Sequence, residues 1–187
     1  MRKLLNFTGN HLPMQKLLLP FISVLFFASC TRTYYVVRHA EKNEAATGGT
    51  TTNATPLSDA GMARANALRD SLATKSIRYV FTTNTVRTRS TGRPTAIASA
   101  ADTLLYATPN SDSLNKFITR IRNIKKNVLI VGHSNTVNDI VNGLSGAQSV
   151  PNDLQEHQFD NLFVIRYSKF LSTKITFTWK KYGTLTP

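Results

Sequence analysis

The stretch Tyr34-Tyr35-Val36-Val37-Arg38-His39-Ala40 decides the fold of this chain. Its four β-prone apolar residues predict a buried strand that ends directly in an arginine and a histidine. Ligands of open α/β sheets bind at the carboxyl ends of the strands, so the stretch predicts a binding site at that edge. The planar guanidinium of Arg38 suits a phosphate group. The imidazole of His39 is a nucleophile or a proton carrier near neutral pH.

Segments with strand and helix patterns alternate after this stretch. A polar loop over residues 43–56, either a lid or an ordinary surface loop, follows the first strand. The expected helices begin at the N-cap residue Ser58 and at about Val86, and cover 114–124 and 137–144. The further expected strands cover 77–81, 104–107, 128–131, 162–167 and 174–181. This alternation predicts an α/β fold, a three-layer α/β/α sandwich with a mostly parallel central sheet.

Two details of this pattern concern single residues. Pro94 lies near the middle of the second expected helix and marks a point where that helix breaks or kinks. In the last strand, Ile175, Phe177 and Trp179 alternate with threonines and are expected to face the core.

Groups that bind phosphate follow three of the predicted strands. They are Arg38 and His39 after the first, Arg87 one helical turn beyond the second, and His133 after strand 128–131. Because the carboxyl ends of parallel strands lie on one edge of a sheet, we expect these four side chains to converge. Two cations and two histidines, without a carboxylate or cysteine cluster of metal-ligand spacing, favour phosphate over a metal. Each residue taken singly also has an ordinary structural explanation, as a strand end, a surface cation or a helix cap.

The amino terminus differs from the rest of the chain. An almost uncharged stretch over residues 17–29 ends at Cys30 and is preceded by Arg2, Lys3 and Lys16. This stretch is too short to span a bilayer but matches the apolar region of a secretory signal. The small residues before the cysteine resemble a bacterial lipoprotein signal. We therefore expect residues 1–29 to be a signal peptide, with a buried helix that is never removed as the alternative.

Cys30 is the only cysteine, so an intrachain disulfide is excluded and lipidation explains the position better than redox chemistry. Met14 is an alternative start that leaves a signal over residues 14–29. Residues 31–33 then separate Cys30 from the first strand, so a lipid on this cysteine holds the domain close to a membrane of the cell envelope.

The formal net charge of +13 raises the question of nucleic-acid binding. The basic residues are scattered, however, without Arg-Gly runs or the aromatic-basic signature of an RNA module. We expect no nucleic-acid partner, because an anionic membrane surface or an anionic substrate explains the charge as well.

Four motifs, in order over residues 33–145, resemble the histidine phosphatase superfamily of phosphoglycerate-mutase-like fold. They are Arg38-His39-Ala40-Glu41 (Arg-His-Gly in the family), Pro56–Gly61 (Leu-Thr-x-x-Gly), Thr83–Arg87 with Thr91 (Ser-x-x-x-Arg-x-x-x-Thr) and Val128–Asn135 (apolar strand, Gly, His). Their compact spacing is most similar to the small phosphohistidine-phosphatase-like members. Residues 31–187 are accordingly expected to form one histidine phosphatase domain.

The resemblance implies a metal-independent, cofactor-free mechanism. His39 attacks phosphorus in line and forms a phosphohistidine that water hydrolyses, which requires one neutral ring nitrogen while the other is held by an acceptor. Arg38 and Arg87 bind the phosphoryl oxygens, and His133 donates a hydrogen bond to the same group. Further contacts to the substrate are expected from Glu41, Lys42, Thr83 and Ser134.

The chain departs from the family pattern at two points. Ala40 replaces the glycine, and no glutamate lies between Arg87 and His133, where many members carry a proton donor. Glu41 is close in sequence to His39 and is an alternative donor. Without a strong donor, phosphoramidates, acyl phosphates, anhydrides and aryl phosphates are the favoured substrates.

The leading function is therefore an exported, membrane-anchored phosphatase that hydrolyses a small phosphomonoester or phosphoramidate. The alternative is a lipoprotein that binds phosphate without turnover because its catalytic site has decayed. Mutase activity is a weaker third possibility, and the pattern leaves the substrate and the oligomeric state open.

Overall fold

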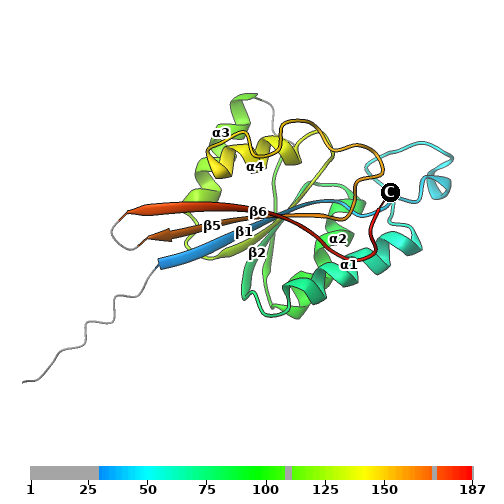
Figure 1. Ribbon diagram of the computed structural model, residues 1–187. Coiled ribbons are helices and arrows are strands. Elements are labelled where there is room, and N and C mark those ends of the chain that lie inside the picture. The colour runs from blue at the N-terminus through cyan, green and yellow to red at the C-terminus, as the bar shows by residue number, and fades with distance from the viewer. Residues whose placement is uncertain (1–29, 108–110, 170–171, 187) are drawn as a thin grey trace, which may run out of the picture.

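A single six-stranded sheet organises the molecule (Figure 1). The computed structural model describes residues 30–107, 111–169 and 172–186, so the expected signal over residues 1–29 lies outside the described residues. The strands are β1 (Cys30–Arg38), β2 (Ile77–Thr82), β3 (Asp102–Leu105), β4 (Asn127–Gly132), β5 (Asn161–Lys169) and β6 (Thr173–Lys181). Their order in the sheet is β3-β2-β4-β1-β5-β6.

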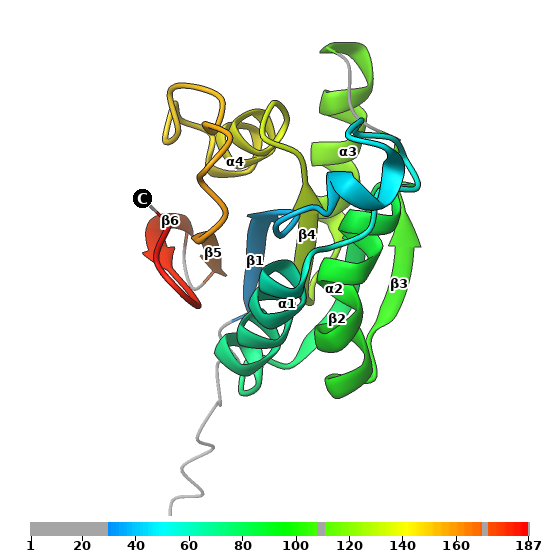
Figure 2. The same cartoon turned by 90° about the vertical axis from the view of Figure 1, so that its right-hand side faces the viewer.

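Parallel pairing joins β1, β4, β2 and β3, whereas β5 and β6 add an antiparallel edge. The helices are α1 (Asp59–Leu72), α2 (Val86–Ala98), α3 (Ser111–Asn123) and α4 (Val137–Ser145), with a short 3-10 helix η1 (Glu44–Thr47). Helices α1 and α2 cover one face of the sheet, and α3 and α4 cover the other (Figure 2). The predicted three-layer α/β/α sandwich with a mostly parallel sheet is therefore confirmed.

Strand β1 serves both cores of the sandwich because its side chains alternate between the two faces. Tyr34 and Val36 pack among the residues of α3 and α4. Tyr35 and Val37 pack on the opposite face, among the residues of α1. The apolar run that predicted a buried strand is thus explained by helices on both faces of the central strands.

Several sequence-based expectations differ from the structure. Strand β3 covers Asp102–Leu105 rather than 104–107, and α3 begins at Ser111 rather than at 114. Strand β1 begins at Cys30 rather than after residue 33, because residues 30–33 pair with β5. Helix α2 continues through Pro94 to Ala98. The expectation that the apolar residues of β6 face the core is wrong for Ile175 and Trp179, which are 38% and 46% exposed. The reason is that β6 is the edge strand of the sheet, so its side chains have a neighbouring strand on one side only (Figure 1).

No helix within the described residues is long and apolar enough to cross a bilayer.

The start of α1 lies directly against the segment that follows β1. Ser58 is the N-cap, as predicted, and its hydroxyl accepts a hydrogen bond from the backbone N–H of Gly61. The backbone N–H of Ser58 donates to the carbonyl oxygen of Glu41 at 3.0 Å. A Cβ atom on Gly61 would lie 2.1 Å from that same oxygen. The glycine is therefore required by a close approach of two backbones.

We expect Gly61→Ala to lower the free energy of unfolding by about 1–3 kcal/mol, because backbone atoms must move to admit the methyl group. The higher helix propensity of alanine partly offsets this loss, by about 1 kcal/mol. Gly143→Ala in α4 is the comparison, since the atoms nearest its Cβ belong to the side chain of the buried Ile118, from 2.8 Å, and not to the backbone. Urea unfolding followed by circular dichroism measures both. A Gly61→Ala protein as stable as the wild type contradicts this account.

Candidate active site

Neighbouring parallel strands bring the two predicted histidines together. Arg38 ends β1 opposite Gly132, which ends β4, and the backbone N–H of His39 donates to the Gly132 carbonyl at 2.9 Å. His39 and His133 are the next residues of the two strands. Their ring centroids lie 5.4 Å apart with an edge-on angle of 67°.

The imidazole of His39 is buried, with 4% of its surface exposed. Its Nδ1 lies 2.8 Å from the carbonyl oxygen of Ala40. A carbonyl only accepts, so Nδ1 carries the hydrogen and Nε2 keeps a free lone pair. Burial lowers the pKa of His39 to about 3, and the positive charge of Arg38 acts in the same direction. The ring is therefore neutral near pH 7, as a nucleophile must be.

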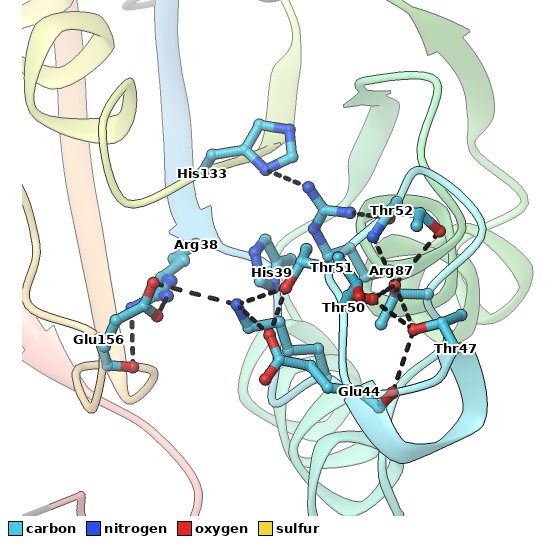
Figure 3. Close-up of polar contacts among 12 residues, drawn as sticks. Arg38, His39, Glu44, Thr47, Thr50, Thr51, Thr52, Arg87, His133 and Glu156 are labelled. Carbon is cyan, nitrogen blue, oxygen red and sulfur yellow. Dashed lines mark hydrogen bonds and ion pairs between the residues drawn. The ribbon is translucent and has the colours of Figure 1, made fainter.

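The guanidinium of Arg38 is almost fully buried and held by the loop that precedes β5. Its Nη1 donates to the carbonyl oxygens of Gln155 and Glu156 at 2.7 and 3.0 Å. Its Nη2 pairs with the carboxylate of Glu156 (Figure 3). The ring of Phe159 lies beneath it, 4.2 Å from the guanidinium carbon. These contacts fix the direction of the positive charge.

Arg87 approaches from the first turn of α2, on the other side of His39 (Figure 3). Its Nη1 donates to the carbonyl of Thr52 at 2.8 Å, and its Nη2 lies 3.5 Å from Nδ1 of His133. Burial and the positive charge of Arg38 lower the pKa of Arg87. The buried Nε atoms of both arginines have no acceptor among the described residues. An anion between the two guanidinium groups would relieve their mutual repulsion.

His133 is held from behind by a threonine. The hydroxyl of Thr83 lies 2.9 Å from Nε2 of His133, and Nδ1 lies beside Arg87. Burial lowers the pKa of His133 to about 4, reinforced by the charges of Arg87 and Arg38. A guanidinium only donates, so here Nδ1 accepts from Arg87 and Nε2 carries the hydrogen toward the Thr83 hydroxyl. When an anion binds Arg87 instead, the hydroxyl of Thr83 can donate to Nε2, and Nδ1 then carries a hydrogen that faces the anion.

These side chains line a cavity of about 450 Å³. Its walls are formed by Arg38, His39, Lys42, Thr51, Asn53, Thr85, Arg87, His133, Ser134, Asn135 and Glu156. All four core residues named from the sequence therefore lie together, and so do Lys42 and Ser134. Three cationic side chains against one carboxylate give the cavity a positive potential that attracts anions.

Two residues that we expected to contact a substrate lie elsewhere. Glu41 turns away from the cavity, because the buried guanidinium of Arg64 binds its carboxylate at 2.7–2.9 Å. Thr83 is buried behind His133, where it orients the ring. The expected roles of Glu41 as a proton donor and of Thr83 as a direct contact are therefore corrected.

The polar loop over residues 43–56 forms one wall of the cavity through Thr51 and Asn53. It is fastened to the start of α2, where the backbone N–H of Val86 donates to the Asn53 carbonyl at 2.8 Å. The buried hydroxyl of Thr55 accepts from the backbone N–H of Thr52 at 2.8 Å. Internal threonine contacts thus give this glycine-containing loop a defined shape.

Sequence reasoning missed the contribution of the loop over residues 146–160. Glu156 and Phe159 contact Arg38 from this segment, which carries no motif. The one available signal was a glutamate in a chain with only ten acidic residues. Thr91 was noted only as part of a motif, and its hydroxyl accepts from the backbone N–H of Ala40 at 2.9 Å. It thereby ties α2 to the turn after β1.

Among the described residues, no group of three or more histidine, cysteine or acidic side chains lies close enough to hold a metal ion.

Comparisons with known proteins agree with this geometry. The family model of the histidine phosphatase superfamily (branch 1) matches residues 34–105, and no curated protein matches the sequence. A solved structure of a candidate phosphohistidine phosphatase SixA from Nakamurella multipartitia has a TM-score of 0.60 at 17% identity, covering 82% of this chain and 98% of that chain. The protein histidine phosphatase SixA complexed with tungstate has a TM-score of 0.59 at 14% identity, covering 80% and 96%.

A mycobacterial glucosyl-3-phosphoglycerate phosphatase in complex with VO3 has a TM-score of 0.57 at 10% identity, covering 80% of this chain and 99% of that chain. At these identities the likeness shows the shared fold.

The buried neutral state of His39 makes stability depend on pH. The folded protein keeps this ring neutral down to about pH 3, whereas the unfolded chain binds a proton below about pH 6.5. The contribution of neutral His39 to the free energy of unfolding is therefore complete above pH 6.5. It is lost as the pH falls below this value, by up to about 1.4 kcal/mol per pH unit. Between pH 7 and pH 5 we expect His39→Gln to lose about 2 kcal/mol less stability than the wild type.

Urea unfolding at the two pH values measures this difference. Carboxylates that also titrate in this range are the same in both proteins, so their effect cancels in the comparison. Equal losses in both proteins would contradict the buried neutral state.

Proposed function

We propose that this chain is a member of the histidine phosphatase superfamily and acts as a metal-independent phosphatase, hydrolysing a small phosphomonoester or phosphoramidate through a phosphohistidine on His39. The observation that carries the proposal is the free Nε2 of a neutral, buried imidazole. It lines the same cavity as two guanidinium groups and a second neutral imidazole. A nucleophile, two charge-neutralising groups and a hydrogen-bond donor are the parts that phosphoryl transfer needs.

In the proposed reaction, Nε2 of His39 attacks phosphorus as the bond to the leaving group breaks. The ring becomes positively charged, and the Nδ1–H that already donates to the Ala40 carbonyl stabilises this charge. Arg38 and Arg87 neutralise the phosphoryl oxygens, and Nδ1 of His133 donates to one of them. Water then attacks the phosphohistidine and releases inorganic phosphate.

The names of the structural neighbours support this range of substrates. They include a protein histidine phosphatase complexed with tungstate and a sugar-phosphoglycerate phosphatase complexed with VO3. Both bound groups are oxyanions, as phosphate is. A cavity of about 450 Å³ with polar walls is consistent with a small phosphorylated substrate for this chain.

We expect His39→Ala to lower the rate of phosphate release from p-nitrophenyl phosphate by about 10³-fold or more, because the nucleophile is removed. Arg87→Ala should lower it by about 10²–10³-fold through the loss of transition-state charge neutralisation. Arg89→Ala, an exposed arginine two positions further along the same helix, is the matched control and should keep the wild-type rate.

Acid-labile, base-stable labelling of the protein by a ³²P substrate tests the intermediate. Unchanged hydrolysis by His39→Ala excludes this nucleophile. Oxyanion binding without turnover on a broad substrate panel supports the non-catalytic alternative instead.

We also propose that the domain is exported and lipid-anchored through Cys30, as the motif before this cysteine favours. Cys30 begins β1, and Arg38 ends the same nine-residue strand. At about 3.3 Å per residue, the anchor and the cavity would lie about 25–30 Å apart, at opposite ends of one strand. A membrane at the Cys30 end would leave the cavity open to soluble substrates.

Palmitate labelling and mass spectrometry of the protein from a bacterial host test the anchor. We expect the mature protein to begin at Cys30 and to carry acyl chains, and Cys30→Ala to remain unlabelled and to leave the membrane fraction. A mature form that retains residues 1–29 rules out the signal.

A further inference from the structure

We infer that Glu156 is the general acid that protonates the leaving group in this site. The inference rests on the proposed phosphatase function and supplies the proton donor missing between Arg87 and His133. The loop over residues 146–160 delivers this carboxylate to the cavity from the far end of the chain (Figure 3).

The other acids near His39 are engaged elsewhere. Glu156 is the one carboxylic acid among the residues that line the cavity, all of them in the described part of the chain. Glu41 is bound by the buried Arg64. Glu44 is bound to Lys42 at 2.9 Å and to the hydroxyl of Thr51, outside the cavity wall.

The position of Glu156 matches the direction in which a leaving group must depart. In-line attack ejects the leaving group on the side of phosphorus opposite the nucleophile. His39 is 4% exposed, so attack from its buried ring directs the leaving group toward the solvent-exposed side of the cavity, its mouth. The side chain of Glu156 lies at this mouth, 73% exposed, while its backbone carbonyl is fixed on Nη1 of Arg38. Because the backbone is fixed and the side chain is exposed, the carboxylate can leave Arg38 by side-chain rotation alone.

Substrate binding changes the electrostatic surroundings of this carboxylate. Without substrate, Glu156 pairs with Nη2 of Arg38, and this hydrogen bond lowers the pKa of its carboxyl group. A phosphoryl dianion competes for the same Nη2 donor. The displaced carboxylate then lies beside a dianion, and Lys42, whose Nζ lies 4.0 Å from its Oε1, is the cation that remains next to it. The added negative charge, together with that of Glu44, favours the protonated form of Glu156 relative to the free site. Binding of the substrate thus prepares the acid.

The proton transfers balance over the two half-reactions. As the bond from His39 Nε2 to phosphorus forms and the bond to the leaving oxygen or nitrogen breaks, the carboxyl proton of Glu156 passes to that atom. The resulting carboxylate then accepts a proton from the water that attacks the phosphohistidine, and inorganic phosphate leaves. At the end of the cycle Glu156 is protonated again. Once phosphate has left, it loses this proton to solvent and pairs with Arg38 as a carboxylate.

A competing explanation makes Glu156 only a counter-ion that occupies Arg38 until phosphate arrives. Substrates with different leaving groups separate the two roles. A general acid matters for an alkyl phosphate, whose leaving alkoxide is strongly basic, and matters little for p-nitrophenyl phosphate, whose leaving group departs as a stable anion. A counter-ion affects both substrates equally, because it acts on the shared phosphoryl group.

The test compares Glu156→Gln with the wild type on these two substrates. We expect kcat/KM for the alkyl phosphate to fall by about 10²-fold while that for p-nitrophenyl phosphate changes by less than about threefold. For the alkyl phosphate, the kcat/KM of the wild type should fall at high pH, where Glu156 has lost its proton. Glu156→Gln should show no such fall. Asp153→Asn, which changes an exposed carboxylate three positions earlier in the same loop and outside the cavity wall, is the control and should retain both wild-type values.

Retained hydrolysis of p-nitrophenyl phosphate shows that Glu156→Gln is folded and that the nucleophile works. Equal changes on both substrates, or a gain on both, overturn the role of Glu156 and leave the proposed function intact. A wild-type protein that hydrolyses neither substrate overturns the proposed function, and this inference with it.

Discussion

The parallel pairing of β1 with β4 is the constraint on which the site depends. The hydrogen bond from the His39 backbone N–H to the Gly132 carbonyl continues that pairing by one residue beyond the end of β1. It sets His39 beside His133 and aims both rings at the carboxyl edge of the sheet. A slip of one residue would turn every side chain of β1 to the opposite face. Both hydrophobic cores therefore enforce the register that the chemistry requires.

The same burial that holds these residues also sets their charge states. Removing the imidazole of His39 from water beside two guanidinium groups keeps it neutral, which makes its Nε2 a free nucleophile. The buried neutral imidazole lowers the free energy of unfolding at acidic pH, because His39 is protonated in the unfolded chain but stays neutral in the folded protein. The counter-charge of the cavity comes from Glu156, which pairs with Arg38. The site is thus organised around an anion.

Neighbouring acidic residues have different roles for geometric reasons. Glu41 lies only two positions after His39, yet it binds Arg64, which also donates to the carbonyls of Tyr182 and Thr184. This buried ion pair joins the turn after β1 to α1 and to the carboxyl-terminal segment. Glu156 is more than one hundred residues from His39 in sequence and lies in the same cavity. Distance along the chain is therefore a poor guide to which carboxylate is available for catalysis.

The sequence alone determined the layered fold and the four converging residues. Apolar runs that end in Arg38-His39 and Gly132-His133 encode both the buried strands and the reactive side chains at their carboxyl ends. The exposure of Ile175 and Trp179 was not predicted, because the alternation of residues within a strand does not show that the strand lies at the edge of the sheet. Only the tertiary structure decided which carboxylate enters the cavity and that Thr83 supports His133. The physical reason is that strands and helices are encoded by local periodicity, whereas contacts made by loops depend on where the rest of the molecule carries them.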